Sequence, residues 1–401
     1  MATKIIYLDN NSTTPVDPRV NEAMALFFCE EFGNAASHSH AFGWYAQEAT
    51  ELARERVAAL ICATAQEIVF TSGATESNNL ALKGTCLSYR SMGNHIITQA
   101  TEHKAVLDVC SSLEEEGFRV TILGVGSDGC VDVEDVASAI TRQTILISIM
   151  AANNEVGTLQ PIEQIGQLCK ERKILFHTDA AQAAGKIPLD VDRIGADLLS
   201  ISGHKIYGPK GVGALYVRRQ RPRVQLSPII HGGGHEQGLR AGTLNVPGVV
   251  GMGLAAEICG QIMPSESERT RLLRDRLQNQ IGERLNNVRL NGHATARLPG
   301  TLNLCFGDVD GRQLLTDLKN IAVSSGSACM SALPEPSYVL RAMGLGDAEA
   351  ASSIRFGIGR FNDESQIDAA AEHVVDVAAR LGAKGGAATG KGGTPQVDPC
   401  G

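Results

Sequence analysis

The stretch ILFHTDAAQAAGKIPLDVDRIGADLLSISGHKIYGPKGVGALYVR (residues 174–218) decides the fold. Three short apolar runs within it, 174–180, 196–202 and 212–218, are predicted to be β-strands, and a helix-length connection separates the first two. Strands that are apolar nearly throughout, with helices between them, are typical of a mostly parallel sheet covered on both faces.

The same alternation of strand-like and helix-like segments extends from about residue 45 to 220. It predicts an α/β fold with a mostly parallel central sheet flanked by helices, in a larger domain of residues 15–260. Further strands and helices are expected at 95–98, 102–116, 119–125, 144–150 and 161–173.

After about residue 260 the pattern changes to charged helices and short, separate strands. We expect a smaller α+β domain made of residues 1–14 and 261–384. The last stretch, 385–401, is Gly-rich and nearly free of large apolar residues, so it is predicted to be a flexible tail. The expected elements of the smaller domain are helices at 265–286, 310–320, 346–352 and 364–381 and strands at 301–306 and 354–359.

The bulk composition fits a two-domain globular protein. The chain has 401 residues, and a chain of this length is usually too long to fold around a single hydrophobic core. A formal net charge of −8 gives no general electrostatic reason to bind nucleic acid or an anionic membrane, and the basic run at 218–223 is interpreted as a solvated strand end. No apolar run approaches the roughly 18 residues of a membrane span, and we expect no signal peptide.

Ten cysteines are scattered without a CxxC pair or a metal-ligand spacing. This pattern predicts neither a disulfide framework nor a zinc site, and no metal centre is expected. Scattered thiols suit a reducing compartment, so we expect a cytoplasmic protein. The segment HGGGHE (231–236) contains residue types that bind metals. Its glycines disfavour the helix that holds the two histidines of an HExxH motif in place, so it is not expected to bind a metal.

Polar segments occur at strand ends and at the following helix starts, where an α/β sheet places a ligand. In TSGATESN (71–78), free N–H groups at a helix start and the Thr75 hydroxyl could hold a phosphate, although ordinary helix capping explains the segment equally well. Asp179 ends a buried strand and therefore requires a partner. That partner could be a protonated pyridine nitrogen, an ion-pairing side chain or a helix N-terminus.

The segment SISGHK (200–205) ends in a lysine about one helix and one strand after Asp179. A βαβ unit brings both side chains to one sheet edge, where a lysine among small residues can act as an amine nucleophile. A lone lysine is more simply a surface residue, but the combination with Asp179, Gln182 and His204 is harder to dismiss. A protein that uses pyridoxal phosphate needs an acid that pairs with the ring nitrogen of the cofactor and a lysine that bonds to its aldehyde carbon.

The segment SSGSAC (324–329) places Cys329 among small residues, shortly before two prolines that discourage a helix. We interpret Cys329 as an exposed, mobile thiol. The alternative is a buried structural cysteine, which is the interpretation that we favour for the other nine.

With these segments the sequence resembles the cysteine desulfurases of the class V aminotransferase family, most of all their housekeeping IscS type. The resemblance covers about residues 5–382, and the combination of motifs is specific although no single motif is. The motifs are YLDNNSTTPVDPRV, FTSGATESNNLALKG, TEHKAVLD, NNEVGTLQPI, HTDAAQAAGK, SGHKIYGPKGVGALY, HGGGHEQGLRAGT, VSSGSACMSA and SSIRFGIGRF.

The resemblance implies the PLP-dependent transferase fold of type I, pyridoxal 5'-phosphate as cofactor and a homodimer. Lys205 would attach covalently to the cofactor, Asp179 would pair with its ring nitrogen, and Gln182 would contact its ring hydroxyl. His103 would stack on the ring and help to move protons. The implied cofactor-binding residues are Gly73, Ala74, Thr75, His103, Asp179, Gln182, Ser202, His204, Lys205 and, from a second subunit, Thr243.

The implied reaction converts L-cysteine to L-alanine, with Lys205, Cys329 and His103 as catalytic residues. Asn154 and Arg355 would bind the substrate carboxylate, to which a bidentate guanidinium is suited. Cys329 as thiolate would take the sulfur and pass it, as a persulfide, to an acceptor protein of iron–sulfur cluster assembly or thiolation.

Some features depart from the family pattern. The segment NAAS (34–37) lacks a usual proline, Ala151-Ala152 lacks a bulkier residue that IscS proteins carry, and the Gly-rich tail does not resemble the family's scaffold-docking segment. Cys400 in that tail is interpreted as a stray thiol. The alternatives are another PLP enzyme that does not use Cys329, such as a selenocysteine lyase or an aminotransferase, and a catalytically silent sulfur-transfer platform.

Overall fold

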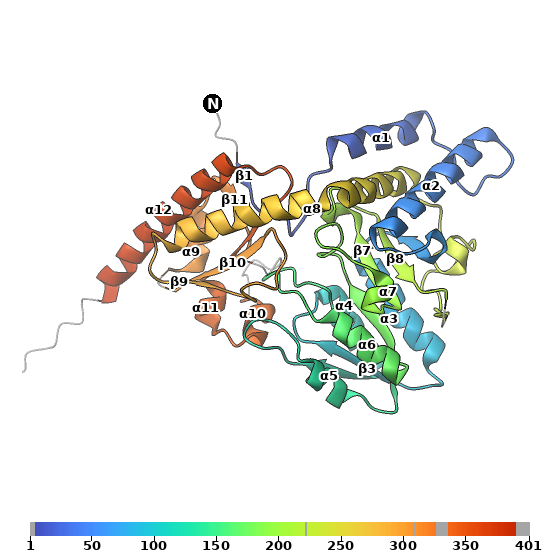
Figure 1. Cartoon of the computed structure of the whole chain (residues 1–401), viewed down its shortest axis with the longest axis horizontal. Helices are drawn as coiled ribbons and strands as arrows, with labels where there is room; N and C mark the ends of the chain where they lie inside the picture. The colour runs from blue at the N-terminus through green and yellow to red at the C-terminus, as the bar shows by residue number, and fades with distance from the viewer. Residues whose placement is uncertain (1–4, 221–222, 308, 326–335, 390–401) are drawn as a thin grey trace, which may run out of the picture.

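The computed structural model describes residues 5–220, 223–307, 309–325 and 336–389, the last six as backbone only. A seven-stranded sheet with the order β2-β8-β7-β6-β5-β3-β4 forms the centre of the larger part of the molecule (Figure 1). Neighbouring strands are parallel except where β8 pairs with β2 and β7. The strands are β2 (Ile68–Thr71), β3 (His95–Gln99), β4 (Arg119–Leu123), β5 (Thr144–Ser148), β6 (Leu175–Asp179), β7 (Leu198–Ser202) and β8 (Gly213–Val217).

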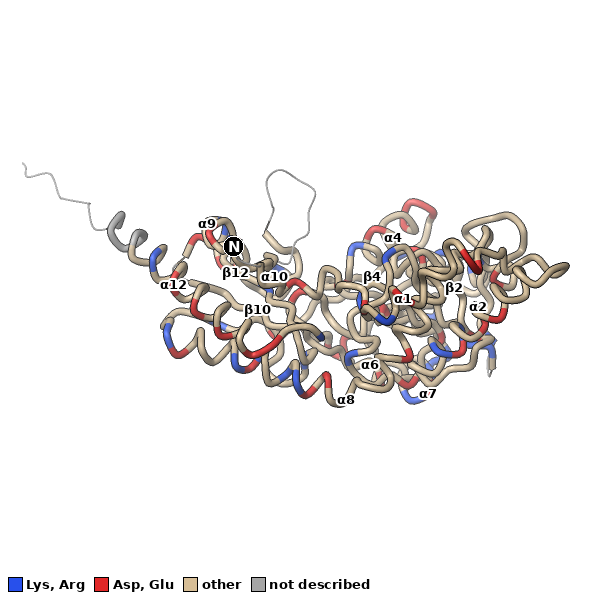
Figure 2. Tube along the Cα trace, turned by 90° about the horizontal axis from the view of Figure 1, so that it is seen from above, with Lys and Arg blue, Asp and Glu red and all other residues tan. Residues whose placement is uncertain are grey.

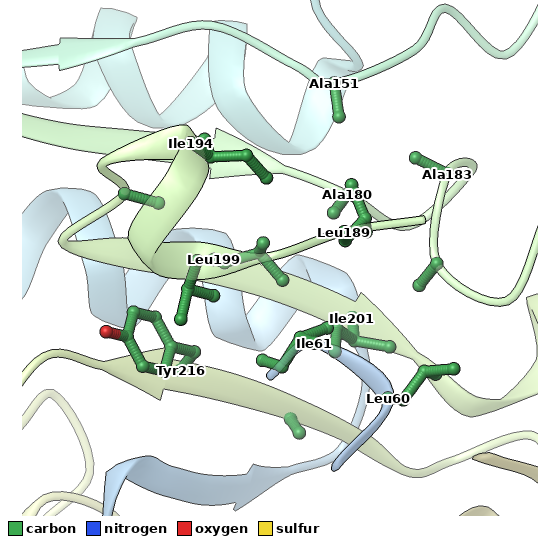
Figure 3. Packing of buried hydrophobic residues seen from close by; sticks show 14 of the residues in the cluster. Leu60, Ile61, Ala151, Ala180, Ala183, Leu189, Ile194, Leu199, Ile201 and Tyr216 are labelled. Carbon is green, nitrogen blue, oxygen red and sulfur yellow. The ribbon is translucent and has the colours of Figure 1, made fainter. Parts of the chain in front are cut away.

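The predicted mostly parallel sheet, covered on both faces, is confirmed. Successive side chains of a strand point to opposite faces, and on β7 Leu199 enters one hydrophobic core while Leu198 enters another. Figure 3 shows part of the first of these cores, where Leu199 of β7 lies near Tyr216 of β8. Burial on both faces explains why the strands appear in the sequence as continuous apolar runs.

Different helices cover the two faces of this sheet. One face packs on α2 (Ala41–Leu60), α6 (Ile162–Arg172), α7 (Val191–Ile194) and the first half of α8 (Val246–Gly282). The other face packs on α3 (Ala74–Tyr89) and α4 (Lys104–Glu115). The remaining helices here are α1 (Pro18–Cys29) and α5 (Val133–Ala139), with short 3-10 turns η1 (Ala65–Glu67), η2 (Gly203–Lys205) and η3 (Glu236–Gly238).

The smaller part of the molecule has its own sheet and core. Its antiparallel sheet has the order β12-β10-β9, beside a two-stranded parallel pair of β1 and β11. Leu277, Leu304, Phe356 and Val374 belong to its core. The elements are β1 (Ile6–Tyr7), β9 (Val288–Leu290), β10 (Thr301–Phe306), β11 (Ile321–Ala322), β12 (Ser353–Gly357), α9 (Gly311–Asp317), α10 (Tyr338–Ala342), α11 (Asp347–Ala351) and α12 (Glu364–Thr389).

Helix α8 is longer than predicted and runs through both parts of the molecule (Figure 1). It packs on α1 and α2 with one half and on α12 with the other, and it continues through Pro264, where the sequence suggested a start. Among the described residues it is the single helix that is long and apolar enough to span a membrane, which corrects the expectation that no run approaches that length. Most of its apolar stretch is buried in the protein core.

Helix α12 also extends further than expected. It continues to Thr389, whereas a flexible tail was expected from residue 385. Residues 390–401, including Cys400, lie outside the described residues. Acidic and basic residues are interspersed along α8 and α12 (Figure 2), and Arg276 of α8 pairs with Asp368 of α12 at 2.6 Å.

We expect Leu277→Ala to destabilise the smaller core. Leu277 is 0% exposed, so the substitution leaves a cavity that costs about 2–5 kcal/mol in free energy of unfolding. Leu272→Ala on the same helix is the matched control, because Leu272 is 54% exposed and its loss costs under about 1 kcal/mol. Urea denaturation measures both, and equal costs would contradict the assignment of this core.

Candidate active site

A cavity of about 640 Å³ opens at the carboxyl ends of β6 and β7, and side chains from both parts of the molecule line it. Its size is typical of a site for a cofactor and a small substrate. Residues predicted from the sequence that line it are Gly73, Ala74, Thr75, His103, Asn154, Asp179, Gln182, Ser202, His204, Lys205 and Arg355.

Asp179 ends β6 with its carboxylate at this cavity. It is 5% exposed and accepts hydrogen bonds from Asn78 Nδ2 at 2.7 Å and from the Ala181 amide at 2.9 Å. No lysine or arginine of the described residues forms an ion pair with it. A buried carboxylate with neutral donors alone leaves room for a cationic partner, which a protonated pyridine nitrogen would be.

Lys205 follows β7 on the short turn η2, which brings its amine to the same cavity. Its Nζ donates to the main-chain carbonyl oxygens of Asn11 and Ser12, the latter at 2.7 Å. Burial, and after it the nearby Lys186 and Arg355 cations, lowers the pKa of Lys205 to about 7. A substantial fraction of the amine is therefore neutral, and thus nucleophilic, near neutral pH.

The turn between β2 and α3 has the geometry of a phosphate cradle. Gly73 has φ of +151°, a conformation that favours glycine, and a Cβ there would meet nothing within 4 Å. Gly213 of β8 permits this turn to approach, because a Cβ at Gly213 would lie 2.6 Å from Gly73 Cα. The free N–H groups at the start of the 16-residue helix α3 and the Thr75 side chain thus face the cavity.

His204 and Ser202 line the cavity near this turn. His204 Nδ1 lies 3.1 Å from Thr13 Oγ1, and burial together with Lys205 lowers the pKa of His204 to about 4. The imidazole is therefore neutral at neutral pH and can donate a proton to a phosphate oxygen in a hydrogen bond. Hydroxyl, imidazole and helix-start donors together suit a phosphate group.

His103 is exposed at the start of α4 and also lines the cavity. Its Nδ1 accepts a hydrogen bond from the Ala105 amide at 3.1 Å. In the neutral ring Nε2 therefore carries the proton, so His103 presents a donor and an aromatic face to the cavity. The adjacent Glu102 is buried beneath, and burial raises its pKa to about 8.

Arg355 on β12 carries positive charge from the smaller part of the molecule into the cavity. Its guanidinium donates to Asp9 Oδ1 at 2.7 Å, Ser12 Oγ at 2.6 Å and the Asn154 carbonyl at 3.0 Å. Arg355 Nε and Asn154 Oδ1 are buried without a hydrogen-bond partner among the described residues. Arg355 Nε–H can donate to a ligand such as an amino-acid carboxylate, whereas Asn154 Oδ1 can only accept, for example from a ligand N–H group.

Several groups that line the cavity or hold its residues were not predicted. The carbonyls of Asn11 and Ser12, which hold Lys205, lie in a segment that was recognised only as a motif. Asn78, which orients Asp179, stood in the predicted phosphate segment without a role of its own. Main-chain acceptors have no residue-type signature, so spacing alone could not identify them.

Two predicted residues do not lie in the described cavity. Thr243 is exposed on the loop before α8 and is not among the residues that line the cavity of its own chain. Cys329 lies outside the described residues. In the HGGGHE segment, Glu236 instead forms a buried ion pair with Arg54, with two contacts of 2.8 Å.

Comparison with known proteins places this cavity in a family. Residues 6–370 match the family described as aminotransferase class V. The chain is 54% identical over 367 residues to cysteine desulfurase IscS of Rickettsia felis, which covers 92% of this chain and 89% of that protein. A solved NifS-like protein has a TM-score of 0.87 and 38% identity, covering 94% of this chain and 100% of its own.

A structure of SspA in complex with cysteine is similar as well, with a TM-score of 0.79 and 40% identity over 89% of this chain and 100% of that chain. The chain belongs to the class V aminotransferase family. Within that family it is a pyridoxal-phosphate-dependent cysteine desulfurase. The predicted fold, cofactor and activity are thereby confirmed, and the lining of the cavity fits the cofactor.

The lowered pKa of Lys205 predicts how cofactor uptake depends on pH. Adding pyridoxal phosphate to the apoenzyme should form the visible absorption band at a rate that rises with pH up to about 7 and then levels off. The neutral amine is the nucleophile, and above its pKa no more of it is gained. Stopped-flow absorbance measures the rate, and Lys205→Arg should form no band. A rate that keeps rising toward about pH 10, as for an ordinary lysine, would contradict the claim that burial lowers the pKa of Lys205.

Proposed function

We propose that the cavity binds pyridoxal phosphate between Asp179 and Lys205 and converts L-cysteine to L-alanine, with the sulfur transferred to Cys329. The observation that carries this proposal is that a buried carboxylate with no basic partner among the described residues shares one cavity with a desolvated amine. Thr75, Ser202 and His204 would hold the phosphate.

The side chains of this protein bind, orient and move protons. Pyridoxal phosphate, when bound, supplies an aromatic ring that withdraws electrons from the substrate α-carbon. The negative charge of Asp179 would stabilise the protonated form of the ring nitrogen. Arg355 and Asn154 would orient the substrate carboxylate. The lowered pKa of Lys205 makes its neutral amine available to take the α-proton, and His103 Nε2–H is a donor in the same cavity.

The sulfur step requires a thiolate. Cys329 as thiolate attacks the sulfur atom of L-cysteine, so that an S–S bond forms while the bond between Cβ and sulfur breaks. The electron pair of the broken bond stays with Cβ, which takes up one proton, and the α-carbon regains the proton that it lost, to give L-alanine. The product on the protein is a persulfide of Cys329.

Both ends of the segment that carries Cys329 start from the cavity wall, which supports this assignment. Ser324 pairs with the main chain of Arg355 at 2.7 and 3.3 Å. Ser337 Oγ lies 2.5 Å from Glu155 Oε2, and both Arg355 and Glu155 line the cavity. Five Cα–Cα steps separate Ser324 from Cys329 in the sequence, and a chain of that length can span at most about 17 Å.

The protein further acts as a homodimer in this proposal. Large apolar side chains at α1 and the start of α2 are exposed, and a second copy would cover them. They include Phe28 (62% exposed), Phe32 (63%), Phe42 (47%), Trp44 (55%) and Tyr45 (54%). Thr243, exposed in its own chain, would then complete the phosphate site of the partner.

The final sulfur acceptor is a protein of iron–sulfur cluster assembly or of thiolation. The similarity to a relative named cysteine desulfurase IscS supports the first of these. A persulfide is itself the form in which one protein thiol can pass sulfur to another.

Replacing Cys329, the thiol that would receive the sulfur, should separate cofactor binding from turnover. Cys329→Ser should keep the visible absorption of the cofactor and its change on adding L-cysteine, yet lower alanine formation at least roughly 100-fold. Cys62→Ser is the matched control, because Cys62, expected from the sequence to be buried, is an exposed thiol that does not line the cavity, and its loss should leave the rate unchanged. Alanine formed by Cys329→Ser at the parent rate would refute the role of Cys329.

Dimer formation should depend on the exposed aromatic cluster. By sedimentation equilibrium the protein should have about twice the mass of one 42.4 kDa chain. Trp44→Asp should shift it toward one chain and reduce activity together, because the phosphate site loses Thr243. Met92→Asp, at a side chain 68% exposed outside the cluster, should change neither. A fully active monomer would show that no second subunit is required.

A further inference from the structure

Lys186 lies four residues after Gln182, in the turn that follows β6, and is held there from two sides. Its main-chain carbonyl accepts a hydrogen bond from Ser267 Oγ of α8 at 2.6 Å. Gly185 has φ of +70°, and a Cβ there would lie 2.9 Å from Cys259 Sγ, so the turn packs directly on α8. The backbone position of Lys186 is therefore set by packing and by a main-chain contact, not by its charge.

No carboxylate of the described residues forms an ion pair with the Lys186 ammonium, although the charge of Glu266 acts on it at longer range. In the part of the chain that the structure describes, Lys186 forms no ion pair, and the neighbouring Glu266 pairs with Arg360 at 3.0 Å. Burial lowers the pKa of Lys186 to about 8, which leaves it mostly charged at neutral pH. A partly buried cation without a counter-ion is unfavourable for folding, and such exceptions concentrate at functional sites.

Lys186 and the Asn11 carbonyl together fix the orientation of the Gln182 amide. Lys186 Nζ lies 3.1 Å from Gln182 Oε1, and an ammonium can only donate, so this end of the amide must be its oxygen. The NH2 end then points the other way and donates to the Asn11 carbonyl at 2.9 Å. Gln182 lines the cavity, so the second hydrogen of its NH2 group remains for a ligand oxygen.

The same contacts connect Lys186 to Lys205. The Asn11 carbonyl accepts from both Gln182 Nε2 and Lys205 Nζ. Lys186 thus acts on Lys205 through one amide and one shared carbonyl, as well as through its charge.

We propose that Lys186 is a positioning residue for the cofactor, which fixes Gln182 with its N–H donor toward the phenolic oxygen of the pyridoxal ring and stabilises that oxygen as an anion. This inference rests on the cofactor site and is independent of Cys329 and of the sulfur acceptor. Its failure and the failure of the sulfur-transfer proposal are therefore distinguishable.

Other charged and titratable side chains surround Lys186 and Lys205, and the test must leave them in place. They come from the N-terminal segment, β6, the turn η2, α8 and β12, and they are Asp9, Asp179, His204, Cys259, Glu266 and Arg355. A substitution of Lys186 alone removes one positive charge and one donor and leaves all of them unchanged.

The test is a pH titration of the visible absorption of the cofactor-loaded enzyme. In Lys186→Met the midpoint of the colour change should rise by about one pH unit. Without the positive charge, and without a donor fixed on the phenolic oxygen, a proton on the nitrogen that joins Lys205 to the cofactor becomes more favourable. Affinity of the apoenzyme for pyridoxal phosphate, measured by fluorescence, should fall by about tenfold.

Three further variants make the result specific. Lys186→Arg keeps the charge, and a cavity of about 30 Å³ beside the turn gives it room, so its midpoint should stay near that of the parent. Lys83→Met is the matched control, since Lys83 is half-buried, has no ion pair among the described residues and donates to Ser112 Oγ at 3.0 Å away from the cavity. Lys186→Gln replaces Lys186→Met if the latter does not fold, and its midpoint should also rise.

An unchanged midpoint in Lys186→Met, or in Lys186→Gln where that variant is used, would overturn the proposal. An equal shift in Lys83→Met would overturn it as well, because the effect would then be one of net charge. A residue that only stabilised the turn would lower the melting temperature and leave the midpoint where it is.

Discussion

The active site depends on one main-chain oxygen, the carbonyl of Asn11. It accepts hydrogen bonds from Lys205 and from Gln182, while the Asn11 side chain donates to Thr301 Oγ1 of β10 at 2.8 Å. One residue therefore ties the catalytic lysine to the smaller part of the molecule. A neutral carbonyl also holds the amine in place without favouring its protonation as strongly as a carboxylate would, and this agrees with the lowered pKa of Lys205.

The parallel sheet supplies the second constraint. Strands β6 and β7 are neighbours and parallel, so Asp179 and the turn that carries Lys205 leave the sheet at the same edge. Asn78 on α3 holds the Asp179 carboxylate through a neutral contact, which leaves its charge available to a ligand. The acid and the amine are thus held on two elements of one rigid layer, while Arg355 reaches the cavity from the other sheet.

Much of this arrangement could be predicted from the sequence, because buried strands appear as continuous apolar runs and because a βαβ unit fixes where their ends lie. Asp179 and Lys205 could be paired for that reason. The Asn11 and Ser12 carbonyls could not be predicted, since any residue supplies a carbonyl and only the tertiary fold brings this one to Lys205. Helix α8 was expected to begin only at residue 265, where the charged pattern starts, whereas packing on both parts of the molecule accompanies one helix that continues through Pro264.

The account requires that one particular lysine holds the cofactor. Lys104, Lys205 and Lys210 all line the cavity, and Lys186 lies close behind it. Reducing the loaded enzyme with borohydride fixes the cofactor to whichever amine carries it, and peptide mapping by mass spectrometry then identifies that residue. The account predicts the label on Lys205 alone; a label on Lys104, Lys186 or Lys210, or no labelled lysine at all, would contradict it.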